Sequence, residues 1–369
     1  MRAAALIVAA GASAVGVAGC RDAAWPSREV EVDRGGAARG GTSPGAGPPA
    51  AARSAGGGTE RADDAPAPVA NAGHLPAALT SVAPPHPDVA PPSLLPPLPS
   101  TPPNAPRARH VIIISEDGLR PDALLRAHGP VVADVMKRAA YSLEAMTIRH
   151  ASTLPSHAAM LSGFDEDVHG VTWNTWRPGR GSILVPTVFD AVEHAGQNSA
   201  AFVGKQKLEH VIPPGSVGLF SHPGFLCHVV SEAAARYFVE NRPALEFVHF
   251  ADPDEIGHHE GWMSDEQIAA IRGTDHCLAT MIDAVHRAGA DADTVFILSA
   301  DHGGHNYNHT GRIKEDRLIP WIAWGAGIRP HRIEAPISTM DTAATALWIL
   351  GYPRPLSMAG RPVEEAFTN

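Results

Sequence analysis

From residue 109 onward, short continuous runs of apolar residues alternate with longer stretches in which apolar positions recur every three or four residues. The first pattern is typical of strands buried on both faces, and the second is typical of helices with one buried face. The runs predict strands over 110–115, 141–148, 200–203, 245–251, 294–300 and 320–324. The longer stretches predict helices over 121–139 (interrupted at Gly129-Pro130), 155–162, 186–195, 231–241, 265–288 and 340–350. This alternation indicates an α/β fold, a three-layer α/β/α sandwich with a mostly parallel central sheet.

The chain before residue 109 has neither pattern. Residues 1–19 combine a positive start at Arg2 with a small-residued apolar stretch, as a secretory signal peptide does. Val17-Ala-Gly-Cys20 resembles the lipobox of bacterial lipoproteins, and the resemblance implies cleavage before Cys20 and attachment of lipid to it. Because the residue after Cys20 is Arg21, the resemblance implies an exported protein that is lipid-anchored to the bacterial cell envelope, in the periplasm at the outer membrane. An ordinary signal peptide with a chance cysteine is the alternative.

Composition divides the remainder into a tether and a domain. Residues 20–108 are rich in Pro, Ala, Gly and Ser, and we expect a disordered tether because they bury too little apolar surface. We expect one catalytic domain over 109–356 and a C-terminal tail over 357–369. The formal net charge of −10 argues against a nucleic-acid-binding surface. Cys227 and Cys277 either form one disulfide in an oxidising compartment or remain two buried thiols.

Polar residues follow four of the predicted strands. They are Asp117 after 110–115, Thr153 and His157 after 141–148, Asp254 and His258 after 245–251, and Asp301, His302 and His309 after 294–300. Ligands of open α/β sheets bind outside the carboxyl ends of the strands, so these side chains are expected to meet at one edge. Carboxylates and imidazoles are ligands for divalent metals, and the pattern therefore predicts a metal site.

In this order, the motifs Asp117-Gly, Thr153-Leu-Pro-Ser-His, Pro253-Asp254-x-x-Gly-His258, Asp301-His302-Gly and His309 resemble those of the alkaline phosphatase superfamily. The best match is its type I phosphodiesterase and nucleotide pyrophosphatase branch, over about residues 110–355. The resemblance implies two zinc ions per chain, with Mn²⁺ or Fe as other candidates. One zinc would bind Asp254, His258 and His309, and the other Asp117, Asp301, His302 and the Thr153 oxygen. It also implies that Thr153 is the nucleophile that forms a covalent phospho-enzyme, and that Asn174 holds a phosphate oxygen.

Two other features bear on the substrate. His309 follows His302 closely, where the longer nucleotide phosphodiesterases hold a large insertion, and this weakens the case for nucleotides. Lys205 and Lys207 resemble lysines of phosphonoacetate hydrolase that hold a second anionic group of the substrate. The alternative is a pair of solvated lysines at the start of a helix.

We therefore expect a two-zinc phosphoryl hydrolase that acts through Thr153 on a small phosphodiester or a related phosphate or phosphonate ester. A phosphonoacetate-type or phosphomonoester hydrolase is the first alternative. A non-catalytic, metal-binding surface lipoprotein is the second, and the presence of every implied ligand argues against it. A sulfatase is disfavoured because sulfatases need Cys or Ser where this chain has Thr153.

Overall fold

The computed structural model describes residues 108–310 and 313–367. The expected signal peptide, Cys20 and all but the last residue of the expected tether lie outside these residues. Within them, no helix combines the length and apolar character that a membrane span requires.

An eight-stranded sheet forms the middle layer of the domain. Its spatial order is β4 (Leu219–Ser221), β3 (Ser199–Val203), β5 (Leu245–Phe250), β1 (His110–Glu116), β6 (Thr294–Ser299), β7 (Leu318–Gly325), β2 (Ala140–Met146) and β8 (His331–Arg332). Neighbouring strands are parallel except where β7 meets β6 and β2, which it pairs in antiparallel fashion. The mostly parallel sheet is confirmed.

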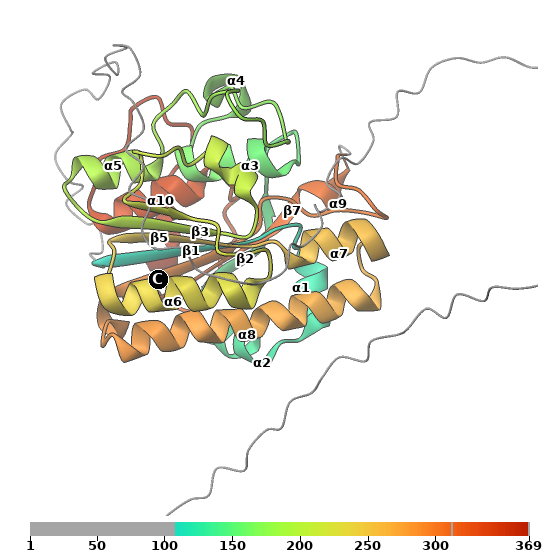
Figure 1. The fold of residues 1–369 in the computed structure, drawn as a ribbon. Helices are drawn as coiled ribbons and strands as arrows, with labels where there is room; N and C mark the ends of the chain where they lie inside the picture. Colours follow the sequence, from blue (N-terminus) through green and yellow to red (C-terminus); the bar gives the residue numbers. More distant parts are fainter. Residues whose placement is uncertain (1–107, 311–312, 368–369) are drawn as a thin grey trace, which may run out of the picture. The chain divides into compact units, whose positions relative to one another are not determined.

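Helices cover both faces of the sheet (Figure 1). One layer holds α6 (Cys227–Asn241) and α8 (Asp265–Arg287), with α1 (Pro121–Ala127) and α2 (Pro130–Met136) packed against α8. The opposite layer holds α3 (Thr153–Ser162), α5 (Val188–His194) and α10 (Asp341–Leu350). The remaining helices are α4 (Glu166–His169), α7 (Asp252–Glu260), α9 (Lys314–Arg317), η1 (Gln206–His210), η2 (Asp291–Asp293) and η3 (Glu364–Phe367). The three-layer sandwich is confirmed.

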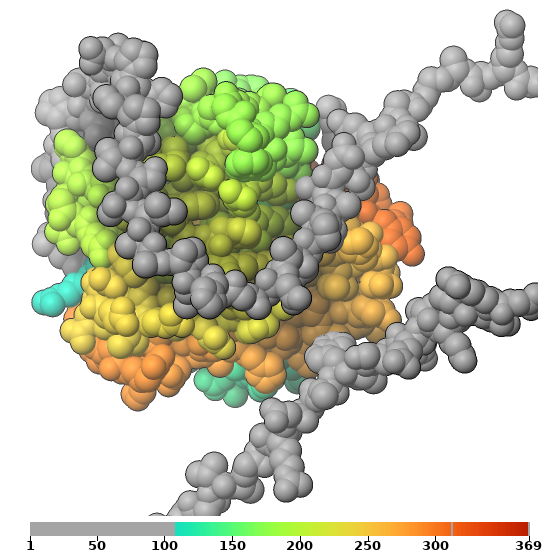
Figure 2. Space-filling view, in the orientation of Figure 1, coloured from blue at the N-terminus to red at the C-terminus, as the bar shows by residue number. Residues whose placement is uncertain are grey.

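Local sequence accounts for the main boundaries. The central strands β1, β5 and β6 are almost wholly buried, as their continuous apolar runs predict. Ser264 accepts a hydrogen bond from the backbone N–H of Gln267 and so caps α8. The surface of α6 lies next to that of α8 on the face shown in Figure 2, since the two helices pack along their length.

Two further contacts complete the packing. Cys227 at the start of α6 and Cys277 in α8 form a disulfide, which decides between the two states left open by the sequence. The residues expected to form a tail instead pack on the domain. Met358, Val363 and Ala366 are buried, and Phe367 lies edge-on against Trp348 of α10. The folded domain therefore extends to Phe367 rather than ending at 356.

Candidate metal centre

The carboxyl ends of three central strands lie level with one another. Glu116 at the end of β1 pairs with Phe250 at the end of β5, and Ser115 pairs with Ser299 at the end of β6. The next residues along the chain are therefore delivered to one edge of the sheet, as expected for a parallel α/β fold. They include Asp117 after β1, helix α7 after β5, and Asp301-His302 after β6.

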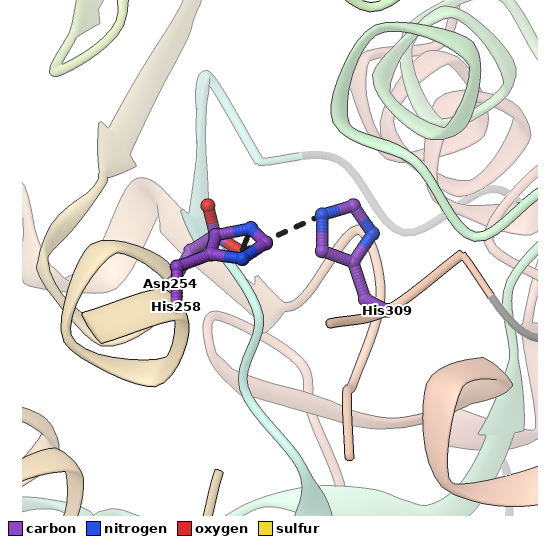
Figure 3. A group of neighbouring side chains, drawn as sticks. All are labelled: Asp254, His258 and His309. Atoms are coloured by element: carbon purple, nitrogen blue, oxygen red, sulfur yellow. Dashed lines mark ion pairs between the residues drawn. The ribbon is translucent and has the colours of Figure 1, made fainter. Parts of the chain in front are cut away.

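Asp254, His258 and His309 form the first group of candidate metal ligands (Figure 3). Asp254 and His258 are four residues apart in α7 and so share one face of the helix. Asp254 Oδ1 lies 3.5 Å from His258 Nε2 and 3.9 Å from His309 Nε2. His258 Nδ1 donates to the carbonyl of Tyr307 and His309 Nδ1 donates to that of Ala151. Both imidazoles therefore turn Nε2 toward the group.

Asp117, Asp301 and His302 form the second group, with ligand atoms within 4.8 Å of one another. Asp301 Oδ1 accepts hydrogen bonds from the backbone N–H groups of Gly118 and His302, which leaves Oδ2 for a ligand. His302 Nδ1 donates to the carbonyl of Gly303, so its Nε2 is the unprotonated nitrogen. Gly118 has φ +72°, and a Cβ there would lie 3.1 Å from Asp254, so this turn favours glycine.

Several buried polar atoms of these groups lack a hydrogen-bond partner among the described residues. They are Asp117 Oδ1, Asp254 Oδ1, Asp301 Oδ2, His302 Nε2 and, beside the groups, Thr153 Oγ1. An unpartnered buried polar atom costs about 1–3 kcal/mol, so five in one place are not expected without a ligand. All five are electron-pair donors, and divalent cations are the ligand class that satisfies such a set. The donor set therefore fits a pair of divalent metal ions of the zinc type.

The ionisation states also suit metal binding. Burial, together with the nearby His302, lowers the pKa of His309 to about 3, and burial lowers the pKa of His302 as well. Both rings are therefore neutral near pH 7, the form in which imidazole binds metals. Burial, with Asp117 and Asp254 as neighbours, raises the pKa of Asp301 well above its usual value. A divalent cation would relieve this crowding of negative charge.

Thr153 is the first residue of α3, at the helix end where backbone N–H groups have no helical partner. The side chain is fully buried. His157, one turn along the helix, donates from Nδ1 to the Thr153 carbonyl at 2.8 Å, and the same nitrogen lies 3.3 Å from Asp301 Oδ2. This imidazole therefore joins the helix start to the second ligand group.

Asn174 also meets the start of α3. Its side-chain carbonyl accepts a hydrogen bond from the backbone N–H of Leu154 at 3.0 Å. Its NH₂ group has no partner among residues 108–310 and 313–367. The geometry presents an amide donor beside Thr153.

Lys205, in the turn after β3, lies within the centre itself. Its Nζ is 2.8 Å from Asp117 Oδ2 and donates a hydrogen bond to Asp254 Oδ2, so one ammonium links the two ligand groups. Burial opposes its charge, yet the two carboxylates outweigh burial and raise the pKa of Lys205 above its ordinary value. Lys207 is buried in η1. The alternative of two solvated lysines is wrong.

Residues 111–329 match the model of the type I phosphodiesterase / nucleotide pyrophosphatase family. The chain belongs to this family. The solved structures that it resembles include murine ectonucleotide pyrophosphatase / phosphodiesterase 5, at TM-score 0.60 and 14% identity over 70% of this chain and 100% of that one. A protein of the alkaline phosphatase superfamily from Vibrio parahaemolyticus is similar at TM-score 0.55 and 15% identity, over 72% of this chain and 71% of that one. The fold is thus that of the alkaline phosphatase superfamily.

The curated relatives of this phosphodiesterase-family chain include proteins named as transferases and mutases. GPI ethanolamine phosphate transferase 1 of Schizosaccharomyces pombe is 24% identical over 60% of this chain and 27% of the relative. The 2,3-bisphosphoglycerate-independent phosphoglycerate mutase of Synechococcus elongatus is 28% identical over 42% of this chain and 30% of the relative. The chain thus spans less than a third of these proteins.

Two buried histidines of the phosphodiesterase-family centre had no predicted role: His157 was expected only to lie at this edge of the sheet, and His249 was not singled out. His157 accepts a hydrogen bond from Ser115 at Nε2, and His249 donates to Asp117 Oδ2 at 3.0 Å. In the sequence, His249 stands out as the one histidine in the apolar strand Leu245–Phe250. In the structure, its ring packs against that of His157 in α3. His249 positions a carboxylate of the second group, and His157 lies 3.3 Å from Asp301 Oδ2, roles that sequence alone does not separate from that of a core histidine.

Proposed function

We propose that the domain is a two-zinc phosphoryl hydrolase that acts on phosphodiesters, with Thr153 as nucleophile and a covalent phosphothreonine between the two half-reactions. One observation carries this proposal. The only unpartnered side-chain atom that α3 contributes from the described residues is the buried Thr153 hydroxyl, and His157 links this helix start to Asp301 of the second ligand group.

The chain's own groups provide much of the chemistry. The Thr153 backbone N–H at the start of α3 would hold a phosphate oxygen, as N–H groups of helix N-termini commonly do. The next N–H groups are engaged or absent, because that of Leu154 bonds Asn174, residue 155 is proline, and that of Ser156 bonds Ser152. The Asn174 amide would donate to a further phosphate oxygen, where negative charge grows in the transition state. When bound, the two cations would favour the Thr153 alkoxide and stabilise charge on the attacking and leaving oxygens.

In this reaction the Thr153 oxygen forms a bond to phosphorus, and the bond from phosphorus to the leaving alcohol breaks. Water then attacks the phosphothreonine and restores the hydroxyl, releasing the phosphate product. Water as acceptor is supported by the open side of the first ligand group, where the His258 side chain is 37% exposed. An organic acceptor in place of water would make the enzyme a transferase.

A second candidate function is hydrolysis of phosphonates or phosphomonoesters, and Lys205 favours it. Its ammonium contacts a carboxylate of each ligand group. It is therefore placed to meet an additional negative charge on a substrate, which a diester lacks and a monoester or phosphonate carries.

The test uses the purified protein. We expect close to two equivalents of zinc per chain and hydrolysis of bis-p-nitrophenyl phosphate that is lost on chelation and restored by zinc. Faster turnover of p-nitrophenyl phosphate or phosphonoacetate would favour the second candidate. A folded protein that binds no transition metal tightly and hydrolyses none of these esters would contradict both.

We further propose that the enzyme is exported and anchored to the cell envelope through lipid on Cys20. The Cys227–Cys277 disulfide supports an oxidising compartment. Cys20→Ser is expected to move the protein from the membrane to the soluble fraction, and an unchanged membrane fraction would contradict the anchor.

A further inference from the structure

A cavity of about 710 Å³ opens where the chain leaves β2 and turns toward α3. One wall is the connecting segment Thr147–Arg149, and a second is Arg317 at the end of α9. The start of α10 and Arg361 form the opposite wall. Its volume is in the range that holds a small organic ligand.

Three arginines line this cavity: Arg149, Arg317 and Arg361. Arg317 donates from Nε to the carbonyl of Ile148 and from Nη2 to that of Thr147, both at 3.3 Å, so its guanidinium is held in place. The side chains of Arg149 and Arg361 donate no hydrogen bond to any residue of 108–310 or 313–367. Their donors are therefore available to a ligand.

The acidic side chains of the cavity are already engaged. Asp341 accepts from the backbone N–H groups of Ser338 and Arg361, at 2.8 and 2.7 Å. Asp165 accepts from the N–H of Glu166 as the cap of α4. Glu144 pairs with Arg332, outside this cavity, at 3.4 Å. Since Glu144 is paired outside the cavity, three arginines face the two carboxylates Asp165 and Asp341, and the one positive charge in excess favours an anion.

Two more observations describe the ligand. Thr147 is 2% exposed, and its hydroxyl has no partner within the described part of the chain, so the wall holds an unused polar atom. Apolar side chains also contribute to the lining, among them those of Met146, Ile337 and Met340. The combination suits an organic anion, with a carboxylate, sulfate or phosphate group on an apolar body.

The wall of the cavity lies close to the metal centre along the chain. Arg149 precedes Thr153 by four residues, which limits the distance between their Cα atoms to about 14 Å. Ala151, between them, accepts the Nδ1 hydrogen bond of the metal-ligand candidate His309 at 2.6 Å. A ligand anchored at the arginines can therefore extend to the nucleophile.

We propose that this cavity is an anion subsite, which binds the distal anionic group of an extended substrate whose phosphoester lies at the metal centre. The part concerning the substrate rests on the proposed function, whereas anion binding does not require turnover. The three arginines hold the distal charge, and the apolar wall packs against the linker of the substrate.

Binding is tested on the zinc-loaded full chain by titration calorimetry. The probes are naphthalene-2-sulfonate, naphthalene-2-carboxylate, phenyl phosphonate and the neutral naphthalene-2-methanol. We expect Arg149→Gln and Arg361→Gln to raise the Kd of an anionic probe about tenfold, as for a lost charged hydrogen bond. The control Arg236→Gln removes an exposed arginine of α6 and should leave Kd unchanged. Equal affinity in all four proteins, or equal binding of the neutral probe, would overturn the subsite.

Catalysis is tested with a pair of p-nitrophenyl diesters that differ only at the far end of a flexible linker long enough to reach the arginines. The diester that ends in a sulfonate should have the higher kcat/KM, and the two arginine variants should remove this preference while sparing the neutral diester. If the probes bind through the arginines but the two diesters react equally, the cavity serves a separate ligand and the substrate assignment is wrong. If neither diester is hydrolysed, the proposed function fails while the binding result still stands.

Discussion

Removing the charge of Lys205 should destabilise the metal-free protein far more than the zinc-loaded protein. The Lys205 ammonium lies 2.8 Å from Asp117 Oδ2 and also bonds Asp254, and its side chain is only 11% exposed. Lys205→Met would leave these carboxylates facing each other without a cation. In zinc-loaded protein, the metals would supply positive charge to the same oxygens.

The magnitude follows from the contact distance. At an effective dielectric constant of about 20, a pair of unit charges 2.8 Å apart gains roughly 6 kcal/mol. Returning the lysine to water offsets part of this, and breaking a buried pair typically costs about 3–5 kcal/mol. We therefore expect Lys205→Met to lower the free energy of unfolding of the metal-free protein by about 3–5 kcal/mol. With zinc bound, the decrease should be less than half as large.

The assay is urea unfolding of both proteins, with a chelator and with excess zinc. Lys205→Arg keeps the charge and should lie closer to wild type, which separates charge from packing. Lys137→Met is the surface control, because its 3.4 Å pair with Asp134 is exposed and should contribute no more than about 1 kcal/mol. An equal loss for Lys205→Met with and without zinc would refute the view that Lys205 and the metals share these carboxylates.

Two other predictions concern the buried acid Glu246 and the amide of Asn174, which would donate a hydrogen bond to a phosphate oxygen. Both oxygens of Glu246 in β5 are buried without partners, and burial raises its pKa well above 4.5, so wild-type stability should fall as the pH rises above about 4.5. In urea unfolding, Glu246→Leu should raise the free energy of unfolding by about 1–3 kcal/mol at pH 5 and by more at pH 8. Glu246→Gln should remove only the pH dependence of stability. A lower free energy of unfolding for Glu246→Leu at both pH values would contradict this. Asn174→Ala should lower kcat about 10²–10³-fold with metal content unchanged, and an unaltered kcat would exclude Asn174 as a donor to the transition state.

The strongly periodic elements could be predicted because burial imposes their pattern. The predicted break at Gly129-Pro130 separates α1 from α2, and the helix start placed at Pro155 moves back only to Thr153. Helix α7 is absent from the predicted elements, since its sequence Asp-Pro-Asp-Glu-Ile-Gly-His-His-Glu has no apolar face. The edge strands β4 and β8 have three and two residues, too few for a pattern to emerge.

The ligands of the candidate metal centre could be predicted from the sequence, whereas the contact of Lys205 and the arginine-lined cavity could not. The strands place the motifs at one edge of the sheet, because parallel strands deliver their ends together. The family resemblance, not the strand pattern, divided them into the two groups that lie together in the structure. The contact of Lys205 with both ligand groups depends on β3 lying next to β5. The spatial order of the strands cannot be predicted from the local pattern of hydrophobic residues. The arginine-lined cavity joins side chains from positions 149, 317 and 361, which no spacing rule connects.

The most direct test of the account is the turnover of Thr153→Ala measured together with its metal content. Asp117, Asp301 and His302 remain to hold the second metal, so we expect metal content equal to wild type. Activity should fall on the order of 10³-fold or more, as when a nucleophile is removed from a unit that acts together. Thr153→Ser keeps the hydroxyl and should retain measurable activity, and acid-quenched wild type should show phosphothreonine at position 153 by mass spectrometry. Near-normal turnover of Thr153→Ala with both metals bound, and no phosphothreonine in the wild type, would contradict the central claim.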